Sequence, residues 1–142
     1  MKIVIASDHG GFDLKNDIAE FLKFKNIDFE DIGTFNANSC DYPFYAKRVC
    51  EEIKSEKFDR GILVCGTGIG MAICANRYRG IRAANVSDTF SARMSRAHND
   101  SNVLTLGQRV VGKGLALDIV DIWLKTPFDG ERHKRRVDMI DN

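Results

Sequence analysis

The sequence predicts an α/β fold, a single domain built on an open, doubly wound, five-stranded parallel sheet of the Rossmann-like type. Short apolar runs bounded by turn residues alternate along the chain with segments whose apolar residues recur every three or four positions. Strands that alternate with helices form a parallel sheet that carries helices on both faces. A chain of 142 residues is long enough for one such domain, which we place at residues 1–142 with strand order 2-1-3-4-5.

The five expected strands differ in how deeply they should be buried. The first, at residues 3–6, is a continuous apolar run, which is typical of a strand buried on both faces. Residues 28–32 alternate polar and apolar side chains and indicate a more exposed edge strand. The remaining strands are expected at residues 61–65, 82–86 and 103–106.

Helices are expected between these strands and after the last one. Helical spacing of apolar residues predicts helices at 13–25, 71–77 and 113–124. Pro43 marks the start of a helix that reaches about residue 55, because proline is favoured in a first turn. Ser87, Asp88 or Thr89 can cap another helix that ends near residue 97. The polar, basic segment from about residue 129 is expected to be a C-terminal helix.

Composition and charge exclude several classes of function. Hydrophobic residues make up 44% and charged residues 29% of the chain, which is ordinary for a globular protein, and the net charge is only +1. These values give no reason to expect a nucleic-acid or membrane partner. The first apolar run is too short for a secretory signal, so we expect a cytoplasmic protein whose four cysteines are reduced.

The most informative motif follows the third expected strand and reads Cys65, Gly66, Thr67, Gly68, Ile69, Gly70. Glycine-rich turns allow backbone N–H groups to hold an oxyanion or a phosphate, and the same positive field favours a thiolate at Cys65. This combination suits proton abstraction beside a carbonyl, and it also suits acyl transfer. The alternative is a tight turn in which Cys65 is a small core residue.

The first strand ends in Asp8 and His9, and the predicted order places that strand end opposite Cys65, where ligands bind in such sheets. Asp8 and His9 can orient a sugar hydroxyl or move a proton, or Asp8 can simply cap the next helix. A lone histidine such as His98, near a helix end, usually contacts the last carbonyls. The three histidines show no metal-ligand spacing, so neither metal nor cofactor is expected.

Arg132 and Arg136 stand four positions apart and share one face of the expected C-terminal helix. Two guanidinium groups on one face can clamp a phosphate. The alternative is a solvated basic tail, which is the usual role of a run of charges.

Six motifs together resemble the type B ribose-5-phosphate isomerases, whose wider group includes the galactose-6-phosphate isomerase subunits. The motifs cover almost the whole chain and stand at residues 8–11, 41–43, 65–70, 98–99 and 107–109 and at the arginine pair. The resemblance implies a metal-independent aldose–ketose isomerase of the pentose phosphate pathway, acting on D-ribose 5-phosphate and D-ribulose 5-phosphate. Two alternatives are an isomerase of allose or galactose 6-phosphate and, in another class, a non-catalytic phosphate-binding module.

The resemblance also implies a role for each matched residue. Cys65 would be the base that moves a proton between C2 and C1 through a cis-enediolate, with Thr67 moving protons on its oxygens. His98 would open the furanose ring, assisted by Asp8. The remaining residues would bind substrate. The enediolate would be held by the backbone of Gly66, Thr67, Gly68, Ile69 and Gly70, and the phosphate by His9, Arg132 and Arg136. The rest of the pocket would be formed by Tyr42, Asn99 and Arg109.

The resemblance finally implies an assembly and a mechanistic branch. Family members form homodimers with shared active sites, in which the region of His98 and Asn99, and Arg109, come from the partner chain; whether dimers pair into tetramers is left open. One branch of the family replaces the cysteine with a glutamate directly after the glycine loop. This chain has Met71 there, which cannot act as a base, so the resemblance places it in the cysteine branch.

Overall fold

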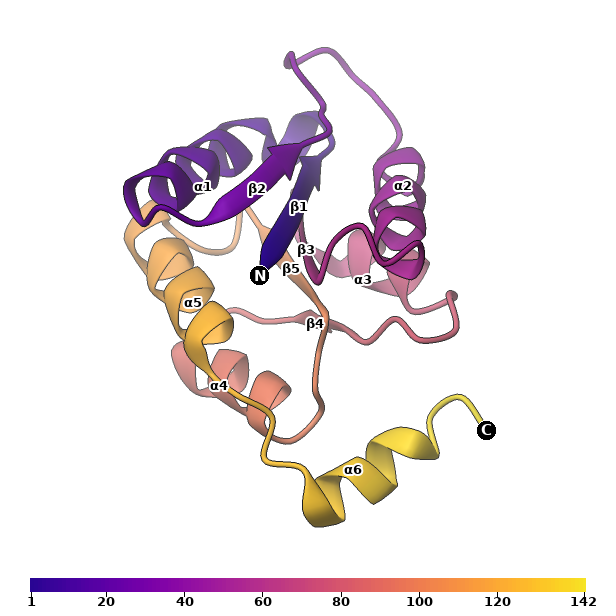
Figure 1. The fold of residues 1–142 in the computed structure, drawn as a ribbon. Coiled ribbons are helices and arrows are strands. Elements are labelled where there is room, and N and C mark those ends of the chain that lie inside the picture. The colour runs from indigo at the N-terminus through magenta and orange to yellow at the C-terminus, as the bar shows by residue number, and fades with distance from the viewer.

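The computed structural model describes all residues, 1–142, and its centre is a five-stranded, all-parallel sheet with the order β2-β1-β3-β5-β4 (Figure 1). The strands are β1 (Lys2–Ser7), β2 (Asp28–Asp31), β3 (Arg60–Cys65), β4 (Ala83–Asn85) and β5 (Val103–Gly107). The predicted α/β class with a parallel sheet is confirmed.

The predicted order of the last two strands is wrong, because β5 and not β4 pairs with β3. Cys65 lies opposite Gly107 in that pair, whereas β4 pairs only with the far side of β5. The physical reason is burial. All five residues of β5 are buried, whereas the three residues of β4 are partly or fully exposed. An apolar strand is stabilised most where both of its neighbours and both sheet faces cover it, so the short, more polar strand takes the edge.

The helices begin close to their expected positions: α1 (Phe12–Phe24), α2 (Tyr42–Lys54), α3 (Ile69–Ala75), α4 (Thr89–Ala97), α5 (Lys113–Lys125) and α6 (Glu131–Asp138). Local signals explain several of these starts. Pro43 lies in the first turn of α2, and the carboxylate of Asp88 accepts a hydrogen bond of 2.7 Å from the Ser91 N–H at the start of α4.

Helices cover both faces of the sheet (Figure 1). Alternate residues of β1 point to opposite faces: Ile3 and Ile5 belong to the core formed with α1, α4 and α5, and Val4 and Ala6 to the core formed with α2 and α3. The fully buried Trp123 of α5 belongs to the first core and the fully buried Met71 of α3 to the second.

Helix α6 lies at the amino-terminal side of the strands, at the bottom of Figure 1. Its start is joined to the end of α4 by a hydrogen bond of 3.0 Å from the Asp129 N–H to the Ala97 carbonyl. Beyond its other end, the Asp141 carboxylate accepts a hydrogen bond of 2.8 Å from the Gly80 N–H. The helix is thus attached at both ends to segments that precede β4 and β5. No helix has the length and apolar character needed to cross a membrane.

Candidate active site

The carboxyl ends of β1 and β3 meet, as the sequence predicts. Ser7 is paired with Val64, and the Asp8 N–H donates a hydrogen bond of 3.2 Å to the Val64 carbonyl. The two turns are so close that a Cβ on Gly10 would lie 3.2 Å from the Gly66 nitrogen. Asp8 and the glycine loop (residues 66–70) therefore face each other across one crevice.

The glycine loop is fixed by close backbone contacts that need the absence of side chains. Gly68 has φ +80°, and a Cβ there would lie 2.9 Å from the carbonyl carbon of Leu106. A Cβ on Gly107 would lie 2.6 Å from the carbonyl carbon of Thr67. The Gly68 N–H donates a hydrogen bond of 3.0 Å to Cys65 Sγ, which holds the sulfur at the head of the loop.

Several polar groups of this loop are available to a ligand. The N–H groups of Gly66, Thr67 and Gly70 make no hydrogen bond within the chain. Thr67 is exposed, and its hydroxyl accepts a hydrogen bond of 3.2 Å from the Ile69 N–H. A thiol, a hydroxyl and free N–H donors in one loop can hold an oxyanion beside a group that moves a proton.

A cavity of about 690 Å³ opens beside this loop, within the size range of small-molecule sites. Residues of the first turn, of the segment before α2 and of α2 itself line it: Asp8, His9, Ser39, Cys40, Asp41, Tyr42, Pro43, Phe44 and Lys47. The Tyr42 ring packs on the glycine loop, because a Cβ on Gly70 would lie 2.8 Å from it. Lys47 is exposed and was not predicted from the sequence, although it follows Pro43 by about one helical turn.

Asp8 and His9 are both held in place by the backbone. Asp8 Oδ1 accepts hydrogen bonds from the N–H groups of Gly10 (2.9 Å) and Gly11 (3.2 Å), so this oxygen caps the following helical turn, as the structural alternative predicts. The second oxygen, Oδ2, makes no hydrogen bond and can contact a ligand. His9 Nδ1 lies 3.2 Å from both the N–H and the carbonyl oxygen of Cys40. That contact fixes the His9 ring whichever nitrogen carries the proton.

Arg109 lies on the same edge as Cys65 in this one chain. Its N–H donates a hydrogen bond of 3.0 Å to the Gly66 carbonyl, and its guanidinium Nη lies 3.4 Å from where a Cβ on Gly66 would be. Within one chain Arg109 therefore lies beside its own Cys65 loop, and its contribution to the site of a partner chain stays a prediction. The reason is the strand order, because β5, which precedes Arg109, lies directly beside β3.

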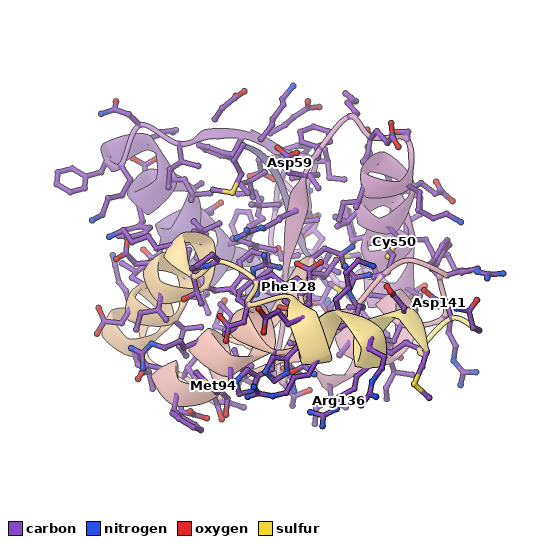
Figure 2. The ribbon with its side chains drawn as sticks, turned by 60° about the horizontal axis from the view of Figure 1, so that its bottom comes forward. Cys50, Asp59, Met94, Phe128, Arg136 and Asp141 are labelled. Carbon is purple, nitrogen blue, oxygen red and sulfur yellow. The ribbon has the colours of Figure 1, made fainter.

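The other predicted residues lie at the opposite edge of the sheet. A helix that follows a parallel strand returns the chain to the amino edge, so His98 and Asn99, which follow α4, lie there. Helix α6 crosses this end of the molecule and carries Arg132 and Arg136 (Figure 2). Residues of both segments line a separate cavity of about 380 Å³: His98, Asn99, His133, Arg136, Val137 and Ile140.

One residue of this amino-edge group was not predicted to be part of the site. His133 is buried, although every residue beside it in the basic run is exposed. Its ring stacks on that of His98 with centroids 4.2 Å apart and planes 6° apart. Burial, followed by the positive charges of His98, Arg132 and Arg136, lowers the pKa of His133. The only sequence signal was that His133 is the one side chain of the run able to lose its charge near neutral pH.

The same residues include the only group of side chains placed to approach a metal ion. Ligand atoms of His98, Asp129 and His133 lie within 4.8 Å of one another. In parallel stacked rings, however, the nitrogen lone pairs lie in parallel planes and do not converge on one ion, and two arginines adjoin the pair on α6. The arrangement therefore does not match a metal centre, in which the ligand nitrogens point at the ion from about 2 Å.

Comparisons with known proteins show which family this chain resembles over almost its whole length. A family model described as Ribose/Galactose Isomerase matches residues 3–140. The ribose-5-phosphate isomerase B of Escherichia coli K12 is 46% identical over 139 residues, which covers 98% of this chain and 93% of that relative. The solved structure of Clostridium thermocellum ribose-5-phosphate isomerase B has a TM-score of 0.98 and 55% identity, covering 99% of this chain and 95% of that one. The Mycoplasma genitalium enzyme, solved with bound ribulose-5-phosphate, has a TM-score of 0.94 and 42% identity, covering 98% and 93%.

Proposed function

The chain belongs to the ribose/galactose isomerase family, and we propose that it interconverts D-ribose 5-phosphate and D-ribulose 5-phosphate in the pentose phosphate pathway of the cytoplasm. The observation that carries this proposal is the position of the Cys65 thiol. It lies at the head of a loop with unused N–H donors, and this loop adjoins a cavity, lined by Asp8 and Tyr42, that is large enough for a sugar phosphate.

The proton transfer would use groups of the carboxyl edge alone. As a thiolate, Cys65 takes the C2 proton of the open-chain aldose, and the electron pair moves through the new C1–C2 double bond onto the carbonyl oxygen O1. Free N–H groups of Gly66, Thr67 and Gly70 stabilise the enediolate oxygens. The Thr67 hydroxyl moves the proton between O2 and O1, and Cys65 returns its proton to C1, which leaves the ketone at C2.

Ring opening and phosphate binding would use groups of both edges. His98 takes the proton of the C1 hydroxyl while the bond from C1 to the ring oxygen breaks; a water molecule protonates that oxygen, and the proton on His98 returns to the hydroxide that this leaves. The free oxygen of Asp8 holds a sugar hydroxyl. Arg132 and Arg136, exposed and without carboxylate partners, would hold the phosphate together with His9.

Because the two groups lie at opposite edges of one sheet, one chain cannot bring them to one substrate. We therefore infer a homodimer in which His98, Asn99 and α6 of each chain cover the Cys65 crevice of the other. Support comes from an unpartnered apolar face beside the glycine loop: Ile69 is 53% and Ile73 is 57% exposed, one helical turn apart on α3. Burying such a side chain completely contributes about 1.5–3 kcal/mol.

The test replaces the thiol and measures ribulose 5-phosphate formation from ribose 5-phosphate. Cys65→Ala should lower kcat by at least about a hundredfold, since a positioned base contributes about 10²–10⁴. Its affinity for the sugar phosphate should stay within a fewfold of that of the unaltered chain. Cys74→Ala is the matched control, because Cys74 is a half-buried thiol near the end of α3 and not at the head of the glycine loop.

The same assay separates the alternatives. Unchanged turnover in Cys65→Ala would overturn the assigned base. A much higher kcat/KM for allose or galactose 6-phosphate would overturn the assigned substrate. Binding of ribose 5-phosphate without any turnover by the unaltered chain would indicate a phosphate-binding module.

A further inference from the structure

The stacked pair of His98 and His133 joins two segments that lie far apart in the sequence. His98 is the residue that ends α4, and His133 lies in the first turns of α6. The rings are nearly parallel and their centroids are 4.2 Å apart, so each ring covers a face of the other. The hydrogen bond from the Asp129 N–H to the Ala97 carbonyl fixes the backbones of the two segments directly beside the stack.

His133 differs from the rest of α6 in a way that a solvated basic tail does not explain. The four basic residues around it are exposed, whereas His133 is 8% exposed. No hydrogen bond of its ring nitrogens to another protein group is present. Its contact with His98 is therefore made through the ring face.

We propose that His133 is a positioning residue for His98: an aromatic surface that fixes the plane of the His98 ring for opening of the sugar. This inference rests on the proposed function, in which His98 accepts the proton of the C1 hydroxyl. That step requires one ring nitrogen to point at the substrate, and a ring free to rotate about its Cβ–Cγ bond would spend little time in that orientation.

The charge state of His133 matters for the same step. When His98 takes a proton it becomes a cation, and a second imidazolium stacked on it would repel it. Burial and the neighbouring charges of His98, Arg132 and Arg136 lower the pKa of His133 and so favour its neutral form beside a protonated His98. The arginines assigned to the phosphate would thus also favour an uncharged ring beneath His98.

The proposal predicts a selective defect, because the two sugar phosphates differ in their need for ring opening. Ribose 5-phosphate enters as a furanose, whereas ribulose 5-phosphate cannot close a five-membered ring, since its C5 hydroxyl carries the phosphate. Exchange of C1 hydrogen of ribulose 5-phosphate with D₂O requires only the Cys65 half of the chemistry. His133→Ala should lower kcat for ribose 5-phosphate about tenfold or more and leave this exchange within about threefold of the unaltered chain.

A second variant tests whether the ring face or a ring nitrogen matters. His133→Phe retains a flat aromatic surface and should restore most of the turnover of ribose 5-phosphate. The matched control is Arg135→Ala, an exposed neighbour on the same helix, which should behave like the unaltered chain.

Other outcomes would overturn the proposal. An equal loss of turnover and exchange in His133→Ala would indicate a structural role only. A raised KM with unchanged kcat would place His133 among the phosphate ligands, and failure of His133→Phe to recover activity would indicate a role for a ring nitrogen. If the unaltered chain itself does not turn over ribose 5-phosphate, the proposed function fails; if it does and His133→Ala equals the control, only this inference fails.

Discussion

Mixing two inactive variants tests whether one active site takes residues from two chains. Cys65→Ala removes the thiol of the carboxyl edge, and His98→Ala removes the imidazole of the amino edge. In a symmetric dimer with shared sites, the mixed dimer has one site that lacks both groups and one site that retains both. Equal amounts of the two chains, combined at random, make about half of all dimers mixed, so about a quarter of the sites are intact.

The assay is turnover of ribose 5-phosphate after the two chains have been co-refolded at equal concentration. We expect about a quarter of the activity of the unaltered chain, whereas each variant alone is close to inactive. The control is a mixture of the Cys65→Ala chain with an Asp8→Ala chain, which should stay inactive. The backbone contact between Asp8 and Val64 places Asp8 and Cys65 of one chain in the same site, so no mixed dimer has an intact site. The reasoning is refuted if the first mixture stays inactive, or if the control mixture recovers.

Two further predictions concern stability in urea unfolding. Gly68→Ala puts a methyl group 2.9 Å from the carbonyl carbon of Leu106 at φ +80° and should lower the free energy of unfolding by about 1–3 kcal/mol. The control Gly114→Ala lies in open space on α5 and should raise it by about 0.5–1 kcal/mol. Equal effects of the two substitutions would contradict the close contact at Gly68. Burial raises the pKa of the Cys50 thiol from 9.0 to about 12, so above pH 9 the unfolded chain loses this proton first and stability falls as the pH rises towards 12. The stability advantage of the unaltered chain over Cys50→Ala should therefore shrink by about 1 kcal/mol between pH 8 and pH 10, and a constant difference would contradict it.

The carboxyl-edge half of the site could be predicted because it depends on rules of local order. Alternating strands and helices make the sheet parallel, and a parallel sheet brings the ends of neighbouring strands to one edge, so Asp8 and Cys65 had to meet once β1 and β3 were neighbours. The position of β5 beside β3 could also have been predicted from the sequence. The run of residues 103–106 is more apolar than 82–86, which contains Arg82 and Asn85, and burial favours the more apolar strand beside β3.

The amino-edge half could not be predicted in the same way. The position of α6 depends on a short link after α5 and on a helix whose surface is almost entirely charged, so no apolar stripe indicates where it packs. The stack of His98 on His133 follows from that packing alone. Likewise, Arg109 could be placed beside Gly66 only after β5 was known to lie beside β3.

The attachment of α6 at both of its ends has a practical consequence for handling the protein. The Asp141 carboxylate is bound to the Gly80 N–H, one residue before the last, so an affinity tag fused after Asn142 would begin inside this contact. Any displacement there would be carried along a helix of only eight residues to Arg136 and Arg132. Met1 is 58% exposed and lies before β1, where its amino group is 4.0 Å from the Asp59 carboxylate. Tags and surface attachment at the carboxyl terminus are therefore expected to disturb the arginines that we propose to bind phosphate.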